Sequence, residues 1–304
     1  MGKRSLFLGM GSVGIATAYA LKSNVNFNVS GYSRGGKAGF KSYLLLTEKS
    51  NIKMPLYLEN DFSLRDMAKP DCIFLSAKAT FNNEYIELIE NISMPDSILF
   101  LLQNGFRNSI QFKSKGYKGR VVDTVVKCCC TKQELNSVLV DTWPEISLDS
   151  NCIDKSILQL LMQTKINGKD LFVSKDKSQF EIESIEKYAF VIAVSSFSIL
   201  KGLPCNRILS SPSYIDLFKS AVYDFAELHA YSHCFKYCNL DAVIEKYLSY
   251  LETISDSFFP SMYLDLRNGL PSEYHMFFDR NPDALHKNTF LNVYNVISSM
   301  AKEV

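Results

Sequence analysis

The amino-acid sequence predicts an α/β domain followed by an all-α domain. Short apolar runs alternate with helical segments of about ten residues in the first half, which is typical of crossover units on a parallel sheet. A glycine-rich turn follows the first of these runs, and from Phe180 onward the apolar residues recur only at helical spacing. A chain of 304 residues suits two domains of ordinary size, and we place them at residues 1–177 and 178–304.

The glycine-rich turn Gly9-Met10-Gly11-Ser12-Val13-Gly14 matches G-x-G-x-x-G. Alone, such a match indicates a turn and little more, but this one follows the apolar run Ser5–Leu8, opens a helix and precedes a second strand at Asn26–Ser30. In that context the glycines make a tight turn, admit a pyrophosphate and let helix and strand pack closely. The phosphates lie at a helix N-terminus, which favours anions. The sequence therefore predicts a Rossmann-type dinucleotide-binding domain, with cofactor-binding residues Gly9, Gly11, Ser12, Val13 and Gly14.

The end of the second strand decides which dinucleotide is bound. A carboxylate there would accept hydrogen bonds from the ribose hydroxyls of NAD, and the sequence has none. Ser33, Arg34 and Lys37 instead offer a hydroxyl and two cations, which suit a 2′-phosphate. The alternative is a solvated basic loop. We predict NADP(H) as the cofactor and Arg34 as one of its ligands.

The remaining strands of the first domain place polar residues at one edge of a sheet. Lys78 follows one buried strand and Asn104 follows the next, and ligands bind outside the carboxyl ends of parallel strands. We therefore expect Gly9, Arg34, Lys78 and Asn104 along one edge. The expected strands are Ser42–Leu46, Met54–Leu58, Asp71–Ala77, Ser97–Leu102, Arg120–Cys130, Ser137–Asp141, Glu145–Leu148 and Asp170–Ser174, with helices at Asp61–Met67, Asn82–Asn91 and Asp154–Gln163.

The second domain is expected to be helical throughout. We expect loops at Asn206–Ser213 and Asn281–Lys287. The expected helices are Phe180–Lys201, Tyr214–Ser232, Leu240–Ser255 and Asn288–Lys302.

Composition excludes several classes of function. The net charge is +1, which offers no electrostatic case for nucleic acid or an anionic membrane, and the longest apolar stretches, such as Tyr188–Leu200, contain serines and are too short to span a bilayer. The chain enters its first strand without a signal peptide, so we expect a cytoplasmic protein whose eight cysteines are reduced thiols.

No metal site is predicted. Cys128, Cys129 and Cys130 are consecutive in a strand, so the middle side chain points away from the other two and the three cannot share one metal. His229 and His233 have helical spacing, but no Glu follows the first histidine as in a zinc protease helix.

Two segments of the helical domain carry candidate catalytic groups. Lys187 lies near the start of a long apolar helix, although cations are favoured at the other end of a helix. Its alternative role is a surface ion pair with Glu183, four residues before it. The turn-rich segment Pro260–Tyr274 carries Asp265 and Arg267, which alone could be a local charge pair.

Together these residues resemble the ketopantoate reductase family over most of the chain. The resemblance rests on the glycine turn, Arg34, Ser76-Ala77-Lys78, Leu102-Gln103-Asn104-Gly105, Lys187, and Ser261-Met262 followed by Asp265, Gly269 and Ser272-Glu273. It implies an NADPH-dependent reductase of a 2-oxo acid, with a Rossmann domain, a helical domain and the substrate between them.

The resemblance also implies roles for single residues. Lys187 resembles the catalytic lysine that donates a hydrogen bond or proton to the developing alkoxide, and Glu273 the acid that holds the substrate hydroxyl and orients the lysine. Ser261 is similar to the serine that binds the substrate carboxylate. Asn104 resembles the asparagine at the nicotinamide ribose and substrate, and Lys78 the lysine at the cofactor edge.

The chain departs from the family pattern at two substrate positions. Members often carry Asn four and eight residues beyond the lysine, where this chain has Val191 and Ser195. Losing such an amide removes a hydrogen bond worth about 1 kcal/mol. The substrate is therefore 2-dehydropantoate or another 2-oxo acid, and a protein that binds NADP(H) as a sensor or scaffold without turnover is the rival. The oligomeric state stays open, with a homodimer as one alternative.

Overall fold

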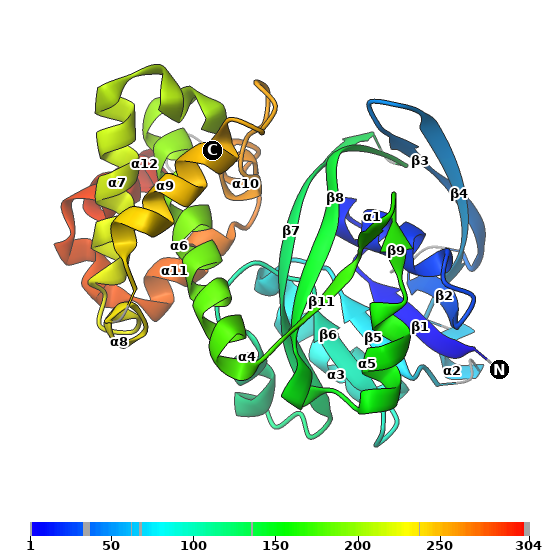
Figure 1. Ribbon diagram of the computed structural model, residues 1–304. Helices are drawn as coiled ribbons and strands as arrows, with labels where there is room; N and C mark the ends of the chain where they lie inside the picture. The colour runs from blue at the N-terminus through cyan, green and yellow to red at the C-terminus, as the bar shows by residue number, and fades with distance from the viewer. Residues whose placement is uncertain are drawn as a thin grey trace. The chain divides into compact units, whose positions relative to one another are not determined.

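A computed structural model describes residues 2–32, 37–61, 63–66, 69–134, 136–236 and 238–300. The chain divides into two compact units, Met1–Glu181 and Ile182–Val304. The first unit combines strands with helices and the second is helical, which confirms the predicted fold class (Figure 1). The observed division lies after residue 181, whereas the boundary predicted from the sequence lies after residue 177.

The first unit is built on one large sheet and a small hairpin. Its strands are β1 (Lys3–Leu8), β2 (Phe27–Tyr32), β3 (Gly39–Leu46), β4 (Asn51–Glu59), β5 (Cys72–Leu75), β6 (Ile98–Leu101), β7 (Arg120–Glu134), β8 (Ser137–Asp149), β9 (Lys165–Ile166), β10 (Lys169–Asp170) and β11 (Phe172–Lys175). Its helices are α1 (Ser12–Lys22), α2 (Ser63–Asp66), α3 (Asn82–Ile92), α4 (Ser109–Ser114) and α5 (Lys155–Met162).

The described strands form a nine-stranded sheet in the order β11-β8-β3-β4-β2-β1-β5-β6-β7. Strands β4, β2, β1, β5, β6 and β7 run parallel to one another, as the crossover pattern predicts. Aromatic rings mark their register, because Phe7, Phe74 and Phe100 are paired across β1, β5 and β6 and stack at centroid distances of 4.8 and 4.9 Å. Parallel strands in register end side by side, so the residues that follow β1, β5 and β6 share one edge.

The strands alternate between two apolar cores, because successive side chains point to opposite faces of a sheet. The core that contains the three stacked rings also receives α1 and α5. The opposite core receives Leu8, Leu75 and Leu101 from the strands, with apolar side chains of α3 and α4. Burial on both faces explains why these strands are short and almost wholly apolar.

The long strands β7 and β8 close the sheet on itself (Figure 1). β7 pairs with β6 on one side and, antiparallel, with β8 on the other, while β8 also pairs with β3. The circuit encloses α1, in which Ile15, Ala16, Ala18 and Ala20 are 0 % exposed. Small side chains let a helix approach strands this closely, which accounts for the alanines of this segment.

Strand β8 corrects a prediction. The sequence predicts two strands, Ser137–Asp141 and Glu145–Leu148, but the structure has one continuous strand. Pro144 lies where the ladder to β7 changes register, since Lys127 pairs with Glu145 while Cys129 pairs with Thr142. A bulge tolerates proline because its position needs no ladder N–H, so the proline bends the strand without ending it.

Short elements were the other source of error. The sequence predicts neither α4 nor the β9–β10 hairpin. Of the expected helix Asp61–Met67, the helix Ser63–Asp66 is observed, while residues 62 and 67 lie outside the described residues. The expected loops Asn206–Ser213 and Asn281–Lys287 contain 3₁₀ helices at Cys205–Ser210 and Pro282–His286. Single turns bury too few residues to leave a periodic signal.

The second unit packs its helices around aromatic side chains. Phe225 stacks on Tyr231 at 4.6 Å, and both contact Tyr188 edge-on. The helix that carries Tyr188 begins at Lys177, in the first unit, and continues through the second. The helices are α6 (Lys177–Lys201), α7 (Pro212–Ala226), α8 (Ser232–Phe235), α9 (Leu240–Leu251), α10 (Ser261–Arg267), α11 (Glu273–Arg280) and α12 (Asn288–Met300).

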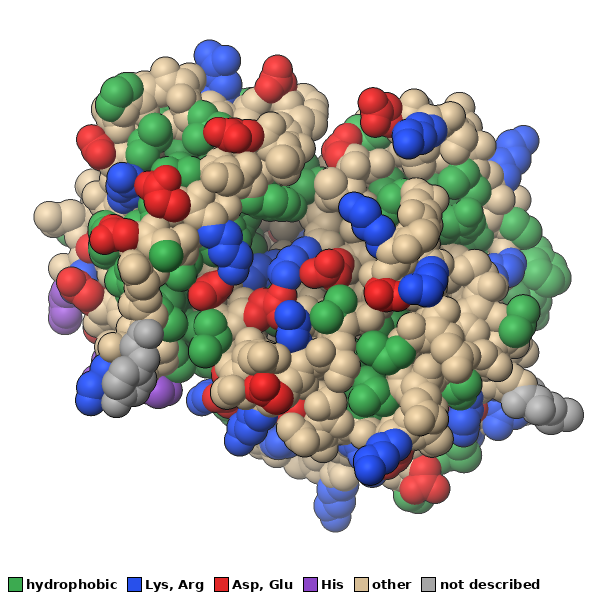
Figure 2. All heavy atoms as spheres, viewed as in Figure 1, with side chains coloured by type: hydrophobic (Ala, Val, Ile, Leu, Met, Phe, Trp, Pro, Cys, Tyr) green, Lys and Arg blue, Asp and Glu red, His purple; other side chains and the backbone are tan. Residues whose placement is uncertain are grey.

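The surface carries both signs of charge. Figure 2 shows Lys and Arg side chains interspersed with Asp and Glu on the visible face, in keeping with a net charge of +1. Among the described helices, none combines the length and the apolar character that a membrane crossing requires.

Candidate functional site

The glycine-rich turn joins the end of β1 to the start of α1, as the motif predicts. Gly11 occupies the N-cap position and makes no side-chain cap, and the first helical bond runs from Ile15 N to Gly11 O at 3.0 Å. The N–H groups of Ser12, Val13 and Gly14 precede that bond, as in the first turn of any helix. They form the positive end of the helix dipole, where an anion is favoured.

The three glycines of the turn differ in what surrounds them. A Cβ on Gly9 would lie 2.2 Å from the Ala77 nitrogen, and the Gly9 φ is +90°, so only glycine fits. A Cβ on Gly14 would lie 2.3 Å from Ser76 Oγ, because helix and strand pack closely there. A Cβ on Gly11 would meet nothing within 4 Å. Two glycines therefore serve packing, and the third keeps the outer side of the turn open, as a pyrophosphate requires.

The neighbouring strand ends bring Lys78 and Asn104 to the same edge as Gly9. Ser76 links the ends of β5 and β1 by hydrogen bonds. Its backbone N–H donates to Leu8 O at 2.8 Å and its hydroxyl donates to Gly9 O at 2.5 Å. Lys78 and Asn104 are both half-buried, and each lies three residues beyond the end of its strand. This edge was expected from the sequence for Gly9, Lys78 and Asn104.

An amide network that the sequence analysis did not anticipate supports this edge. Gln103 donates from Nε2 to Ala77 O at 2.7 Å and to Asn82 Oδ1 at 2.6 Å. Asn82 in turn donates to Gln111 Oε1 at 2.9 Å. The network joins the ends of β5 and β6 to α3 and α4. Its only signal in the sequence is a glutamine directly after a buried apolar strand.

The end of β2 holds the predicted determinant of cofactor choice. Ser33 and Arg34 lie outside the described residues, and Lys37 is exposed. The structure adds a carboxylate that the sequence did not place here, because β4 brings Glu59 into register with Tyr32, the last residue of β2. Glu59 is 9 % exposed. The residues that follow β2 in the sequence do not include Glu59, because Glu59 belongs to the neighbouring strand β4. A search for a carboxylate at the end of β2 alone therefore misses it.

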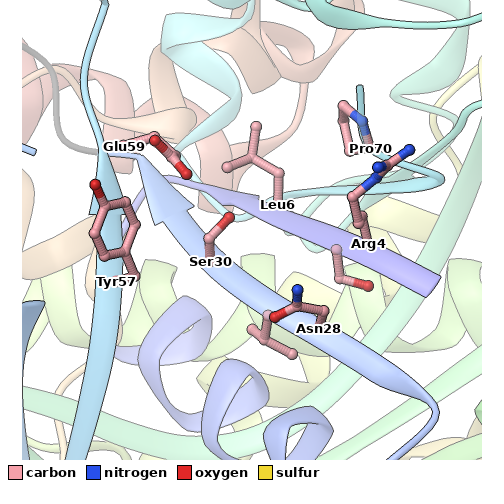
Figure 3. Close-up of a pocket in the computed structure, with 9 residues that line it drawn as sticks. Arg4, Leu6, Asn28, Ser30, Tyr57, Glu59 and Pro70 are labelled. Atoms are coloured by element: carbon pink, nitrogen blue, oxygen red, sulfur yellow. The ribbon is translucent and has the colours of Figure 1, made fainter. Parts of the chain in front are cut away.

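Glu59 lines a pocket of about 240 Å³ on the β1–β2–β4 face (Figure 3). Figure 3 shows its carboxylate at one end and Arg4 towards the other, with Ser30 and Asn28 along β2 between them. None of the cofactor-binding residues predicted from the sequence lines this pocket. The full lining is Arg4, Ser5, Leu6, Asn28, Val29, Ser30, Tyr57, Glu59 and Pro70.

In the second unit, α6 carries Lys187, Val191 and Ser195 at a spacing of four residues, which places them on one helix face. Lys187 and Val191 are half-buried and Ser195 is fully buried. Within the part of the chain that the structure describes, Ser195 Oγ has no hydrogen-bond partner. Neighbouring Ser196 donates to Ile192 O at 2.8 Å.

Glu273 is the first residue of α11 and is 9 % exposed. Ser272 caps the helix by accepting from Tyr274 N at 3.3 Å, and its hydroxyl donates to Met262 O of α10 at 3.1 Å. Position N1 stabilises a negative side chain through the helix dipole. The cap therefore fixes Glu273 relative to the helix that Ser261 begins; Ser261 itself is exposed.

Glu273 is also electrostatically close to α6. Burial raises the pKa of Tyr188 well above its ordinary value; the Tyr231 phenol and the Glu273 carboxylate raise it further, and Arg280 opposes them. A direct contact also joins the two helices, since Tyr274, the residue after Glu273, lies within hydrogen-bond distance of Ser196 on α6. Among the described residues, no group of three or more His, Cys, Asp or Glu side chains could hold a metal.

Comparison with known proteins identifies the fold of both units. Residues 6–150 match the family described as ketopantoate reductase PanE/ApbA, and residues 179–279 match its C-terminal part. The chain belongs to the ketopantoate reductase family. The resemblance seen in the sequence is thereby confirmed. The family consists of oxidoreductases that use a nicotinamide cofactor.

Solved structures of ketopantoate reductases share the whole fold at low identity. The 2-dehydropantoate 2-reductase of Geobacter metallireducens has a TM-score of 0.78 and 18 % identity, over 99 % of this chain and 100 % of that one. The dimeric ketopantoate reductase of Staphylococcus aureus has a TM-score of 0.76 and 16 % identity, over 99 % of each chain. A D-mandelate dehydrogenase with NADH and anilino(oxo)acetate has a TM-score of 0.79 and 15 % identity, over 98 % of this chain and 99 % of that one. No curated protein matches the sequence.

Proposed function

We propose that the protein reduces a 2-oxo acid to the 2-hydroxy acid with NADPH. The observation that carries the proposal is the glycine turn of a ketopantoate reductase fold, with Gly9 and Gly14 packed and Gly11 open. The default substrate is 2-dehydropantoate, and the alternative is a related 2-oxo acid.

The cofactor proposal rests on the carboxyl edge of the sheet. Gly9, Gly11, Ser12, Val13 and Gly14 hold the pyrophosphate against the first turn of α1. Lys78 lies at the cofactor edge and Asn104 at the nicotinamide ribose. A bound nicotinamide supplies the hydride.

The choice of NADPH over NADH rests on the basic residues after β2. Arg34 pairs with the 2′-phosphate as a planar fork, and Lys37 adds a second cation. The position of Glu59 favours NADH, because a carboxylate beside the end of β2 can accept hydrogen bonds from the ribose hydroxyls. A D-mandelate dehydrogenase of similar fold has been solved with NADH, so both cofactors belong in the assay.

Lys187 and Glu273 are the proposed catalytic residues. Hydride addition to a ketone leaves negative charge on the oxygen, which the Lys187 ammonium stabilises and protonates. Glu273 accepts the substrate hydroxyl proton in a hydrogen bond and orients the lysine. The burial of Glu273 and its place at the start of α11 support this role, because both limit the motion of its carboxylate.

The substrate proposal involves Ser261 and Asn104 as polar contacts and Val191 and Ser195 as the adapted wall. Ser261 binds the carboxylate of the 2-oxo acid. Val191 replaces an amide by an isopropyl group, which favours a substrate with an apolar group there. Val191→Asn should therefore improve kcat/KM for 2-dehydropantoate relative to 2-oxo acids with larger apolar side chains.

A panel of 2-oxo acids tests the proposal directly. It includes 2-dehydropantoate, branched aliphatic 2-oxo acids and aryl 2-oxo acids, each with NADPH and with NADH, followed by the nicotinamide absorbance. Turnover of at least one substrate is expected. If no substrate of the panel is turned over although the protein binds NADPH tightly, the protein belongs to the rival class of non-catalytic sensors or scaffolds.

All eight cysteines are free thiols, which suits a cytoplasmic location. A homodimer is proposed by analogy with the dimeric Staphylococcus aureus enzyme, and sedimentation velocity tests it.

A further inference from the structure

Two buried side-chain amides flank Asn104 in the turn that follows β6. Gln103 comes directly before it and is 5 % exposed, and Asn108 lies four residues after it and is 4 % exposed. Both amides donate hydrogen bonds to backbone carbonyl oxygens at the carboxyl edge of the sheet. Buried side chains with backbone partners are held in one position, so these two amides are candidates for residues that fix the site.

The bond from Gln103 fixes the backbone that leads into Lys78. Gln103 Nε2 donates to Ala77 O at 2.7 Å, and that carbonyl belongs to the peptide group between Ala77 and Lys78. Because a peptide group is planar, holding its oxygen also sets the direction of the Lys78 N–H. Ala77 in turn lies against the glycine turn, since its nitrogen would be 2.2 Å from a Cβ on Gly9. One amide therefore joins the ends of β1, β5 and β6.

The bond from Asn108 fixes the backbone that follows Asn104. Asn108 Nδ2 donates at 2.8 Å to Asn104 O, the carbonyl of the peptide group that leads into Gly105. Gly105 has a φ of +122°, and a Cβ there would lie 2.8 Å from Asn108 Oδ1, so this amide packs directly on the backbone. Arg107 has a φ of +52°, which residues other than glycine seldom adopt unless the surrounding structure imposes it. The turn is therefore held in one conformation.

The hydrogen-bond partners decide which way each amide points. Backbone carbonyl oxygens only accept, so Gln103 and Asn108 both face them with their NH₂ groups. Gln103 Nε2 also donates to Oδ1 of the fully buried Asn82 at 2.6 Å. Gln103 Oε1 is buried and has no hydrogen-bond partner within the part of the chain that the structure describes. The side chain of Gln103 therefore acts through its donors.

The buried acceptor indicates that Gln103 serves more than stability. A buried carbonyl oxygen without a partner destabilises a fold, and an apolar side chain of the same length would avoid that penalty. Proteins depart from such rules mainly at functional sites. Gln103 lies beside Asn104, the proposed contact of the nicotinamide ribose, and holds the backbone before Lys78 from there.

We propose that Gln103 and Asn108 are positioning residues for the dinucleotide, because their amides hold the peptide groups that orient Lys78 and Asn104. The proposal rests on the proposed function, in which Lys78 and Asn104 contact the cofactor. Each amide acts through a backbone carbonyl. Asn108 acts on Asn104 and hence on the nicotinamide half of the cofactor, while Gln103 also acts on Lys78.

Matched variants separate positioning from stability. Gln103→Met keeps the length of the side chain and removes both donors, and Gln103→Glu, which lacks the NH₂ group, is the second variant. Asn24 is the control, because it is buried and lies before β2, at the amino ends of the parallel strands. Its Nδ2 also donates to two oxygens, Leu160 O at 3.0 Å and Thr164 Oγ1 at 2.8 Å.

The two sites should differ in their effect on binding. Gln103→Met and Asn24→Leu should both lower the melting temperature, but only Gln103→Met should raise the Kd for NADPH, by about tenfold. A purely structural role of Gln103 predicts the loss of stability alone. An unchanged Kd in the folded Gln103 variants would therefore overturn the proposal.

A cofactor fragment tests the part played by Asn108. Asn108→Asp keeps the shape of the side chain and replaces the donor to Asn104 O by an oxygen atom, and Asn108→Ala repeats the test without a new charge. The Kd for NADPH should rise about tenfold in both variants. The Kd for adenosine 2′,5′-bisphosphate, which lacks the nicotinamide half, should stay nearly unchanged. Equal losses for both ligands would show a general loosening of the domain and overturn the role of Asn108.

Amide hydrogen exchange follows the same effect without any ligand. Peptides that contain Lys78 or Asn104 should exchange faster in Gln103→Met than in the parent, and Asn24→Leu should leave them unchanged. Unchanged exchange in Gln103→Met would contradict the proposal even if the Kd rose. A parent protein that does not bind NADPH would overturn the proposed function and with it the role in binding, while the exchange rates would still decide whether Gln103 fixes this edge.

Discussion

Ser196 Oγ on α6 and Tyr274 Oη on α11 lie 2.5 Å apart, with both residues fully buried. The bond joins the helix of Lys187 to the helix that Glu273 begins. Burial raises the pKa of the Tyr274 phenol, and the contact with Ser196 offsets part of that rise. The phenol is therefore a neutral hydrogen-bonding group that holds α11 against α6.

Removal of this bond should loosen the acid next to it. Tyr274→Phe keeps the ring and deletes the hydroxyl, so we expect a loss of about 1 kcal/mol in unfolding free energy. The kcat should fall several-fold with little change in NADPH affinity, because the start of α11, which carries Glu273, is no longer bonded to α6. Urea denaturation and steady-state kinetics measure the two effects. Unchanged kcat in a folded variant would show that the bond does not position Glu273.

The glycines of the turn provide a matched pair. Gly14→Ala should destabilise the fold by about 1–3 kcal/mol, since its Cβ meets Ser76 Oγ at 2.3 Å and Gly9 O at 2.5 Å. Gly11→Ala should leave the unfolding free energy nearly unchanged, because its Cβ meets no protein atom within 4 Å. It should instead raise the NADPH Kd about tenfold by occupying the approach of the pyrophosphate. Isothermal titration and thermal melting of both variants separate the effects, and normal NADPH affinity in Gly11→Ala would refute the placement of the pyrophosphate.

Lys187 should matter to turnover and not to folding. Lys187→Ala is expected to lower kcat by about 10²–10⁴ on whichever 2-oxo acid is turned over, with NADPH affinity nearly unchanged. Lys201, exposed on the last turn of the same helix, is the control, and Lys201→Ala should behave as the parent enzyme. Persisting activity in Lys187→Ala would mean that another group supplies the proton.

Cofactor choice should respond to Arg34. Arg34→Ala should reduce the preference for NADPH over NADH by about ten- to hundredfold, the worth of roughly 1.5–3 kcal/mol for a charge-assisted hydrogen bond. Glu59→Gln tests the competing carboxylate and should weaken NADH binding if Glu59 reaches the ribose. Fluorescence titration of the parent and both variants with NADPH and with NADH gives the six dissociation constants. Equal affinities of the parent protein for NADPH and NADH would remove the case for NADP(H).

The base of β1 should lose stability in acid. Burial raises the pKa of Asp71, but the Arg4 backbone N–H and the Lys3 ammonium outweigh it and lower the pKa below 3.8. A depressed pKa gives stability that is present above the unfolded value and is lost as pH falls through the folded value. Asp71→Asn should therefore be less stable than the parent at neutral pH, and the gap should close below pH 3.8.

Asp123 is the contrasting control. Burial raises its pKa, against two hydrogen bonds from Ser109. A carboxyl with a raised pKa stabilises the fold increasingly as pH falls from its folded value to its unfolded value. The gap between the parent and Asp123→Asn should thus change with pH in the opposite direction to that of Asp71→Asn. Urea denaturation over a series of pH values measures both, and parallel slopes would contradict these assignments.

Strong local patterns accounted for most of what the sequence predicted correctly. The run Ser97–Leu102 lies on a strand and Leu240–Ser255 on a helix because their periodicity is unambiguous, although the observed elements are Ile98–Leu101 and Leu240–Leu251. The two strands expected at Ser137–Asp141 and Glu145–Leu148 are one strand, because the break at Pro144 is absorbed by a bulge in the ladder to β7. Such a feature belongs to a pair of strands, and a single segment carries no trace of it.

The candidate site shows the same division. The order of Gly9, Lys78 and Asn104 along one edge follows from parallel strands in register, which an alternating strand–helix pattern already implies. Glu59 reached the end of β2 on a neighbouring strand, and the amides of Gln103 and Asn82 met from different elements. These positions depend on which strands pair, so no local pattern predicts them.

The sequence alone therefore determined the class of each domain, the glycine turn and the family, because these depend on local periodicity and on residue types at fixed spacing. Tertiary structure decided the closure of the sheet by β7 and β8 and the bond from Ser196 to Tyr274. Each of these depends on twist, register and packing between segments, and those arise only when the chain has folded.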